Sequence, residues 1–429
     1  MNHKPTRRAF LKTTTLTGLG LVLNRRAPAI GSSISPSEKL NIGVVGVSGR
    51  GHQNLGAVSD ENIVALCDID EKNLHAAAER FPHAKRYQDF RHMLDTTDLD
   101  AVVVSTPDHT HAVVTVASLK SGKHVYCEKP LTHSVHEAHV VAATTKKHRA
   151  ATQMGTQIHA GDNYRRVVEL INTGAIGHVR EAHAWVGKGW GGGERPATGQ
   201  PLPSHIDYDV WLGPAPERPY HSCYLPRNWR RWWDFGGGTL ADMGCHYLDL
   251  IHWALDLRNP IEVEAEGPPV HPETAPEWLI VRYRHTARGS LPPVDVTWHD
   301  GGKRPPYLSE GQLPEWRNGV LFVGDEGMLL AGYSSYVLLP EKKFADFSPP
   351  RPSIPPSIGH HAEWIEACKT GAPTTCNFDY SGALAETALL GVVAYRSGKS
   401  FVWNRHDFKT SEASANKFLR REYRKGWSL

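Results

Sequence analysis

The sequence lacks any run of 18 or more apolar residues, although 40% of its residues are hydrophobic. A membrane-spanning helix needs about 20 such residues in a row, so we expect no membrane span in the mature chain. Charged residues make up 22% of the chain, which is ordinary for a globular enzyme. Because 429 residues exceed what one core usually supports, two domains are expected.

An excess of charge of one sign is also missing once the first 31 residues are set aside. That segment has no acidic residue, and its six cations are Lys4, Arg7, Arg8, Lys12, Arg25 and Arg26. The formal net charge of +3 therefore becomes −3 for the rest of the chain. Nucleic-acid binding usually requires a basic surface, so no nucleic-acid partner is predicted.

Cysteines are few and show no metal-type spacing. The six of them are Cys67, Cys127, Cys223, Cys245, Cys368 and Cys376. We predict no metal site and mostly buried free thiols, with a bridge between the close pair Cys368 and Cys376 as the alternative.

The N-terminal segment has the pattern of a targeting signal. Thr6-Arg-Arg-Ala-Phe-Leu-Lys12 precedes a modestly apolar stretch at 13–23 and the small-residue site Ala27-Pro-Ala29. It resembles a twin-arginine export signal, a route that carries folded proteins across the bacterial inner membrane. We therefore expect residues 1–30 to be a signal segment and the protein to be periplasmic.

Strand-like and helix-like segments alternate from residue 38 to about 155. Apolar strands are predicted at 40–47, 63–67, 101–105, 124–127 and 151–154, with helices between them. This alternation predicts an α/β fold in which a doubly wound parallel sheet forms a Rossmann domain at 38–155.

The pattern changes in residues 156–429. After a long segment rich in Gly, Pro and aromatic residues (187–238) and a helix at 239–255, strands follow one another without intervening helices up to residue 339. Such a succession predicts a second α/β domain with an open, mainly antiparallel sheet.

A glycine-rich turn follows the first strand and reads Gly46, Val47, Ser48, Gly49, Arg50 and Gly51. It is a degenerate form of the turn that lets a backbone approach a dinucleotide pyrophosphate, with Ser48 in the place of the middle glycine. Asp68 ends the second strand, where a carboxylate can accept both ribose hydroxyls and repel a 2′-phosphate. NAD is favoured, and NADP stays possible because Arg50 could bind a phosphate.

Polar residues also follow two later strands, where an open parallel sheet binds its ligands. The predicted cofactor contacts there are Ser105, Thr106, Pro107, His109, His111, Glu128 and Lys129. The alternative is that Asp108 or Thr110 caps a helix and the two histidines are incidental.

The helix at 239–255 carries Asp242, His246 and Asp249 on one face, because they are spaced i, i+4 and i+7. A histidine beside carboxylates suits a general base that removes a hydroxyl proton. A solvated face or a buried ion-paired network would give the same pattern, so both alternatives stay open.

Together the glycine turn, Cys67-Asp68, Ser105-Thr-Pro-Asp-His-Thr-His111, Glu128-Lys-Pro130 and Asp242-x-Gly-x-His246 resemble the Gfo/Idh/MocA family of oxidoreductases acting on sugars and cyclitols. The resemblance covers about residues 38–400. It implies a Rossmann domain, a second domain whose open sheet often makes oligomer contacts, and catalytic roles for Lys129, Asp242 and His246. A homo-oligomer, either a dimer or a tetramer, is therefore expected.

Aromatic residues are concentrated in the segment 187–238. This concentration predicts a carbohydrate site, because aromatic faces stack on sugar rings. The predicted substrate contacts are Trp190, Trp232, Trp233, His299, Asp300 and Arg304. For any single Trp, packing in the core is the competing interpretation.

Three functions fit these residues. The first is oxidation of a hydroxyl of a sugar or glycoside with tightly bound NAD. The second is a redox-neutral glycosidase or lyase that passes through a transient ketosugar. The third is a non-catalytic protein that binds NAD or a sugar.

Overall fold

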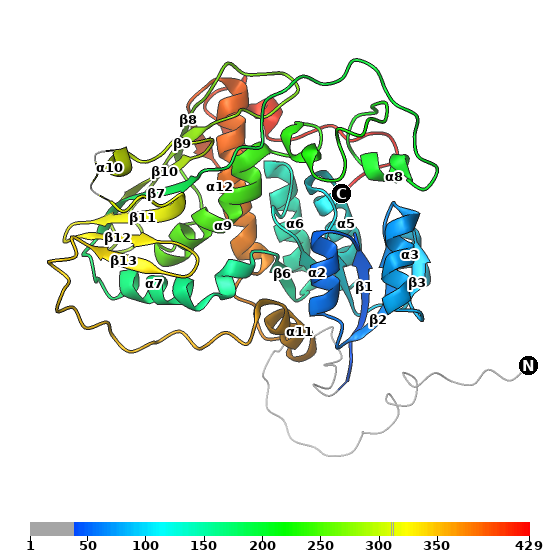
Figure 1. Ribbon diagram of the computed structural model, residues 1–429, viewed down its shortest axis with the longest axis horizontal. Coiled ribbons are helices and arrows are strands. Elements are labelled where there is room, and N and C mark those ends of the chain that lie inside the picture. The colour runs from blue at the N-terminus through cyan, green and yellow to red at the C-terminus, as the bar shows by residue number, and fades with distance from the viewer. Residues whose placement is uncertain (1–37, 310, 312) are drawn as a thin grey trace, which may run out of the picture. The chain divides into compact units, whose positions relative to one another are not determined.

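The computed structural model describes residues 38–309, 311 and 313–429. The export signal predicted at residues 1–30 lies outside the described residues and stays a prediction. Helices and strands carry the labels of Figure 1.

A parallel sheet organises the first part of the chain. Its elements are β1 (Asn41–Val45), α2 (Arg50–Ala57), β2 (Asn62–Cys67), α3 (Glu71–Arg80), β3 (Lys85–Tyr87), α4 (Phe90–Thr96), β4 (Ala101–Val104), α5 (Asp108–Lys120), β5 (His124–Cys127), α6 (Val135–His148) and β6 (Thr152–Met154). The strand order β3-β2-β1-β4-β5-β6 is doubly wound, which confirms the predicted Rossmann sheet. In such a sheet the order of the strands reverses between β1 and β4, although all strands are parallel. Ligands bind there, beyond the carboxyl ends of the strands.

Five of these six strands were located in the sequence, and four of them, β1, β2, β4 and β5, carry the apolar signal of a buried parallel sheet. All four residues of β4 are buried, for example. The sixth, β3, has the sequence Lys-Arg-Tyr, and its first two residues are exposed. Its apolar signal is missing because it lies at the edge of the sheet.

The second part of the chain builds a nine-stranded sheet. Its elements are η1 (Gln157–Ala160), α7 (Asp162–Asn172), β7 (Val179–Val186), α8 (Tyr208–Leu212), η2 (Asn228–Arg231), α9 (Gly238–Ala254), β8 (Glu262–Glu266), β9 (Ile280–His285), β10 (Val294–His299), α10 (Pro306–Ser309), β11 (Asn318–Gly324), β12 (Met328–Ala331), β13 (Tyr336–Leu339), α11 (His360–Thr370), α12 (Phe378–Ser397), β14 (Phe401–Asn404), β15 (Lys409–Thr410) and η3 (Asn416–Phe418). The strand order is β13-β12-β11-β7-β10-β9-β8-β14-β15, and only β7 and β10 pair in parallel. The prediction of a mainly antiparallel sheet is confirmed.

Two helices, α9 and α12, pack side by side against this sheet (Figure 1). Helix α12 also contacts α6 of the Rossmann domain, so it lies between the two sheets. Asn377 caps its first turn by accepting from the N–H groups of Asp379 and Tyr380, and Gly398 ends it in the left-handed conformation. Helix α9 is thereby held where its N-terminal half can meet the Rossmann loops.

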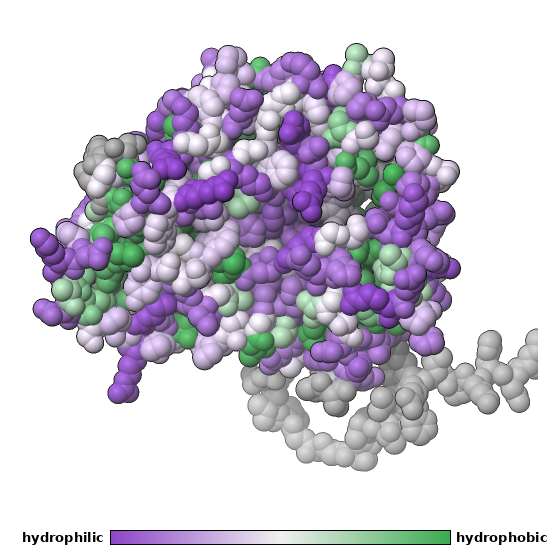
Figure 2. Space-filling view, in the orientation of Figure 1, coloured by the Kyte–Doolittle hydropathy of each residue, from purple (hydrophilic) through white to green (hydrophobic). Residues whose placement is uncertain are grey.

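The surface offers little apolar area in Figure 2, where hydrophobic residues form small scattered groups among hydrophilic ones. In the part of the chain that the structure describes, no helix is both long and apolar enough to cross a membrane. All six cysteines are free thiols and five are buried, so the predicted free thiols are confirmed and Cys368 is not bridged to Cys376.

Candidate active site

The glycine turn between β1 and α2 is tight enough to require glycine at two positions. At Gly46 φ is +82°, and an added Cβ would lie 2.6 Å from the carbonyl oxygen of Ser105. A Cβ at Gly51 would lie 1.8 Å from the carbonyl oxygen of Gly46. No side chain caps the start of α2, and the N–H of Gly51 donates to the carbonyl oxygen of Ser48 at 2.9 Å. The neighbouring first-turn N–H groups can donate to an anion such as a pyrophosphate.

Asp68 lies beside this turn at the end of β2. Its Oδ2 accepts from the N–H of Val47 at 2.9 Å, and its Oδ1 accepts from the N–H of Asp70 at 3.0 Å. Burial raises the pKa of this carboxyl above its ordinary value. Oδ1 also accepts from Asn73 Nδ2 at 3.3 Å, whereas Oδ2 keeps a lone pair for a ribose hydroxyl, so the turn and Asp68 together fit a nicotinamide dinucleotide.

Arg50, which could have bound the 2′-phosphate of NADP, forms an ion pair with Glu128. Its Nε lies 3.1 Å from Oε1 of the buried Glu128, and its Nη1 donates to Gln53. The same Oε1 accepts from Asn54 at 3.0 Å and from Gln157 at 2.9 Å. Glu128 thus ties α2 to the loop after β5, and the sequence analysis missed Asn54 and Gln157.

The two predicted cofactor histidines differ in position. His111 lies between the two loops, with Nδ1 2.6 Å from the carbonyl oxygen of Pro130 and Nε2 2.7 Å from that of Thr106. His109 is fully buried, bonds to the carbonyl oxygen of Trp211 at 2.7 Å and packs on that indole. The structure thus places His109 in packing contacts, and its predicted cofactor contact stays a prediction.

Lys129 of the Rossmann domain contacts Asp242 of the C-terminal domain. The Nζ of Lys129, at the end of β5, donates to Oδ1 of Asp242 at 2.6 Å and to its main-chain oxygen at 2.9 Å. Both side chains are largely buried. This contact places the N-terminal half of α9 at the carboxyl edge of the Rossmann sheet.

Two further cations and an indole surround the same carboxylate. Lys188 Nζ lies 2.9 Å from Oδ2, Trp190 Nε1 lies 2.8 Å from Oδ2, and Arg230 Nε lies 3.0 Å from Oδ1 of Asp242. Burial acts to raise the pKa of Asp242, but the charges of these cations and Lys129 hold it well below its ordinary value. Asp242 is therefore ionised at neutral pH.

His246 follows Asp242 by one helical turn and has an unused ring nitrogen. Its buried Nδ1 has no hydrogen-bond partner among the described residues. Burial, together with the charge of Lys129, lowers the pKa of His246 to about 3. The imidazole is therefore neutral at pH 7 and able to accept a proton from a ligand.

Asp108, at the first position of α5, is a second carboxyl near these groups. Burial raises its pKa to about 8, although the positive charge of Arg230 acts in the opposite direction. At pH 7 this carboxyl is mostly protonated and adds little negative charge to the site.

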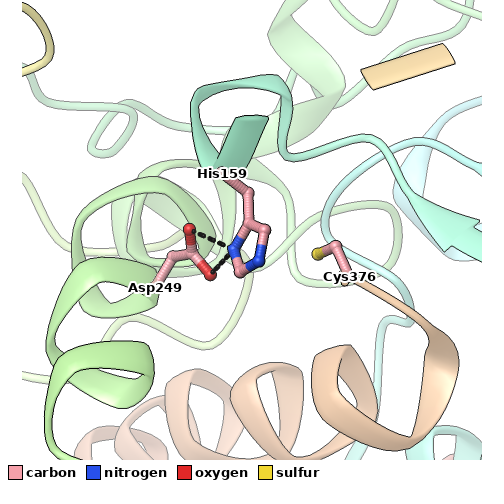
Figure 3. A group of neighbouring side chains, drawn as sticks. All are labelled: His159, Asp249 and Cys376. Atoms are coloured by element: carbon pink, nitrogen blue, oxygen red, sulfur yellow. Dashed lines mark hydrogen bonds and ion pairs between the residues drawn. The ribbon is translucent and has the colours of Figure 1, made fainter. Parts of the chain in front are cut away.

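The third member of the predicted α9 stripe, Asp249, lies away from the first two. It is fully buried and accepts hydrogen bonds from His159 Nδ1 at 2.9 Å and from Tyr380 at 2.7 Å. Asp249 therefore belongs to a buried ion-paired network, which was one of the alternatives for this helix face. Figure 3 shows His159 between Asp249 and Cys376, and the ligand atoms of these three lie within 4.8 Å of one another. Burial raises the pKa of Cys376 well above its ordinary value, whereas a metal ligand would be a thiolate.

The predicted sugar contacts separate into two groups. Trp190 contacts Asp242, as described, and Arg304 is exposed. Trp232 and Trp233 are buried, with Trp233 Nε1 bonded to the carbonyl oxygen of His271 at 3.0 Å. We correct both indoles to packing residues, because neither has a face open to a ligand.

His299 and Asp300 are likewise buried, at the end of β10. His299 Nε2 lies 3.3 Å from His183 Nδ1, and Asp300 Oδ2 accepts from Trp298 Nε1 at 2.9 Å. These contacts hold the sheet and its following loop together, so the two residues are corrected to structural ones.

Lys188 and Arg230 were missed by the sequence analysis. Lys188 lies between two glycines in the long loop, and Arg230 lies in η2 directly after Trp229. A cation inside a Gly- and Trp-rich loop was a usable signal, but only the fold shows that both converge on Asp242.

Residues 40–156 match the model described as "Oxidoreductase family, NAD-binding Rossmann fold", and residues 167–429 match its "C-terminal alpha/beta domain". The chain therefore belongs to the Gfo/Idh/MocA oxidoreductase family, whose N-terminal domain binds NAD. The resemblance found in the motifs is confirmed.

Two curated relatives illustrate the similarity. The inositol 2-dehydrogenase of Salmonella typhimurium is 30% identical over 150 residues, which cover 34% of this chain and 45% of that protein. A glycosyl hydrolase family 109 protein of Solibacter usitatus is 32% identical over 200 residues, which cover 42% of this chain and 45% of that protein. The matched region thus spans less than half the length of these relatives.

Solved structures share the fold over most of the chain. The WlbA dehydrogenase of Chromobacterium violaceum, in complex with NADH and UDP-GlcNAcA, has a TM-score of 0.62 at 17% identity and covers 88% of this chain and 99% of its own. The aldose-aldose oxidoreductase of Caulobacter crescentus has a TM-score of 0.56 at 17% identity and covers 85% of this chain and 100% of its own.

Proposed function

We propose that this protein oxidises a hydroxyl group of a sugar or glycoside and uses NAD as the hydride acceptor. The observation that carries the proposal is the contact of Lys129 with Asp242 at 2.6 Å, with His246 one turn further along α9. It brings a cation, an ionised carboxylate and a neutral imidazole to the edge of a NAD-binding sheet.

Each of these residues has a distinct task. Lys129 donates a hydrogen bond to the reacting hydroxyl oxygen and stabilises the negative charge that develops there. His246 accepts the hydroxyl proton, and the nearby Asp242 carboxylate favours the imidazolium that forms. Asp242 stays ionised and fixes the position of Lys129. NAD, when bound, accepts the hydride that leaves the same carbon, so that a carbonyl group results.

Two further features belong to this proposal. The predicted export signal would carry a folded protein into the periplasm, where free NAD is not supplied. We propose that NAD is loaded before export and stays tightly bound, so that it must be re-oxidised in place.

A second function has support in the relative from glycosyl hydrolase family 109. In that scheme oxidation of a ring hydroxyl acidifies the neighbouring C–H group, elimination expels the leaving group, water adds, and the hydride returns to the sugar. The same Lys129 and His246 would serve the oxidation step.

Product analysis separates these functions. The purified protein is incubated with a panel of glycosides and free sugars, and the products are identified by mass spectrometry. A ketosugar or lactone, two mass units lighter than the substrate, supports the dehydrogenase. Release of free sugar from a glycoside without net oxidation supports the hydrolase, and no turnover of any compound contradicts both.

A further inference from the structure

We propose that the substrate is an anionic sugar whose negatively charged group binds Lys188 and Arg230 beside the reacting hydroxyl. The inference rests on the proposed oxidation and specifies the class of its substrate. Two observations support it: the positive charges around Asp242 outnumber the negative ones, and the two additional cations are more exposed to solvent than Asp242 and Lys129.

The charges around Asp242 do not cancel. Lys129, Lys188 and Arg230 lie within 3.0 Å of its carboxylate, and among the described residues no other carboxylate lies within 4.0 Å of their nitrogens. Asp108 is mostly protonated and adds little negative charge. Three positive charges therefore share one negative charge, which leaves an excess of about two.

Stabilising Asp242 does not require this many cations. Lys129 alone, at 2.6 Å, balances the carboxylate's charge. Cations brought together without partners repel one another, and partly buried charges in proteins are usually paired. The positive charge of an oxidised nicotinamide would add to the excess, so an anionic ligand is the missing partner.

The exposed fractions show where that ligand would lie. The side chain of Asp242 is 4% exposed and that of Lys129 is 13% exposed, whereas Arg230 is 24% and Lys188 is 40% exposed. The negative charge thus lies at the bottom of the site and the two additional positive charges lie at its mouth. A ligand entering from solvent meets Lys188 and Arg230 before it reaches Lys129.

Both cations keep donors for a ligand. Arg230 uses Nε on Asp242 and Nη1 on the carbonyl oxygen of Arg227, and Nη2 has no hydrogen-bond partner among the described residues. Lys188 rests over the ring of Trp190, at 4.5 Å from its centroid, while one of its N–H groups bonds to Asp242. A guanidinium and an ammonium on either side suit a carboxylate or a phosphate ester, which share anionic oxygens.

The test compares matched sugars that differ in charge. Wild-type protein is assayed for single-turnover reduction of its bound nicotinamide with methyl glucoside, methyl glucuronide and glucose 6-phosphate. We expect the second-order rate constant of reduction with the uronide or the phosphate ester to be at least about tenfold above that with the neutral glucoside. The preference between the uronide and the phosphate ester identifies the anionic group. Higher ionic strength should lower the rate constant of the charged sugar and leave that of the neutral glucoside unchanged.

Lys188→Gln and Arg230→Gln should each reduce the charged-to-neutral ratio about tenfold. Because the ratio compares two sugars on one variant, a general loss of activity cancels. Lys399→Gln, which removes an exposed cation just after α12, is the control and should leave the ratio unchanged. A variant without turnover is compared by equilibrium binding of the same sugars, followed by tryptophan fluorescence.

Two results would overturn the inference and leave the proposed function intact. One is oxidation of the neutral glucoside as fast as of both charged sugars. The other is a charged-to-neutral ratio that neither variant changes. Absence of nicotinamide reduction with all three sugars and with the wider panel would instead remove the proposed function itself.

Discussion

Single residues at the site owe their chemical state to burial and to their neighbours' charges. Asp242 is ionised because three cations surround it, His246 is neutral because burial lowers its pKa to about 3, and Asp108 is mostly protonated because burial raises its pKa to about 8. These opposite states of two carboxyls and one imidazole give each residue a separate task.

Lys129→Met tests the residue assigned to the reacting oxygen. The variant should keep NAD, because the glycine turn and Asp68 lie elsewhere in the Rossmann domain, but lose at least about a thousandfold in kcat. Single-turnover reduction of the bound nicotinamide measures the hydride step directly. Activity within tenfold of the wild type would remove Lys129 from the mechanism.

Asp108→Asn tests the protonated carboxyl through stability. An Asp whose folded-state pKa is raised stabilises the protein below its unfolded-state value near 3.8, and that stabilisation is lost as pH rises towards about 8. The amide cannot ionise, so the variant should lose less stability than the wild type between pH 4 and pH 8. Melting temperatures across this range give the comparison, and parallel curves for the two proteins would show that Asp108 is ionised when folded.

The sequence allowed prediction of those site residues that belong to short local patterns. The glycine turn, Asp68 and Lys129 follow strands, and Asp242 and His246 lie one turn apart on α9. Lys188 and Arg230 lie in a loop, and their meeting on Asp242 depends on how that loop crosses the domain. Trp232 and Trp233 were wrongly placed because a Trp-rich segment looks the same whether it binds sugar or packs on itself.

Among the secondary-structure elements, α9 shows how one helix serves both the site and the core. Its N-terminal half presents Asp242 and His246 to the Rossmann loops, whereas Asp249 lies buried against His159 and Tyr380. The i, i+4, i+7 spacing predicted a common face correctly but not that its last member would be enclosed by η1 and α12. Edge strands such as β3 and β15 were missed because they are too short or too polar to give a periodic signal.

Asp249→Ala tests the structural end of α9. Removing the carboxylate leaves the buried Nδ1 of His159 without its acceptor, whereas the hydroxyl of Tyr380 keeps the main-chain oxygen of residue 249 at 3.0 Å. The free energy of unfolding should therefore fall by about 3 kcal/mol. Asp379→Ala, which removes an exposed carboxylate at the start of α12, should cost about 0.5 kcal/mol. Urea unfolding measures both, and equal effects would show that the buried network contributes nothing of its own.

In the molecule as a whole, the Rossmann domain supplies the glycine turn and Lys129, and the C-terminal domain supplies Asp242 and His246. The site exists only where the two domains meet. The order of the Rossmann strands and the antiparallel character of the second sheet were predictable, because buried strands alternate with helices in one half and follow one another in the other. The packing of the domains against each other was not predictable from such periodicities.

Retention of NAD is a property of the whole protein and follows from the proposed periplasmic location. The protein is purified without added nucleotide, dialysed extensively and denatured, and NAD in the supernatant is quantified. We expect about one NAD per chain and a slow off-rate, whereas Asp68→Ala should lose the cofactor on dialysis. An empty wild-type protein that works only with freely exchanging NAD would contradict tight binding.

The most direct test of the account follows the hydride itself. A sugar that the protein converts is prepared with deuterium at every ring carbon and incubated with the wild-type protein. The nicotinamide cofactor is then extracted, and its mass is measured by mass spectrometry. If a hydride leaves the sugar for NAD, the reduced cofactor gains one deuterium in the wild type and none in Lys129→Met. Conversion of the sugar with no deuterium on the nicotinamide would contradict the claim that this protein is a sugar-oxidising enzyme.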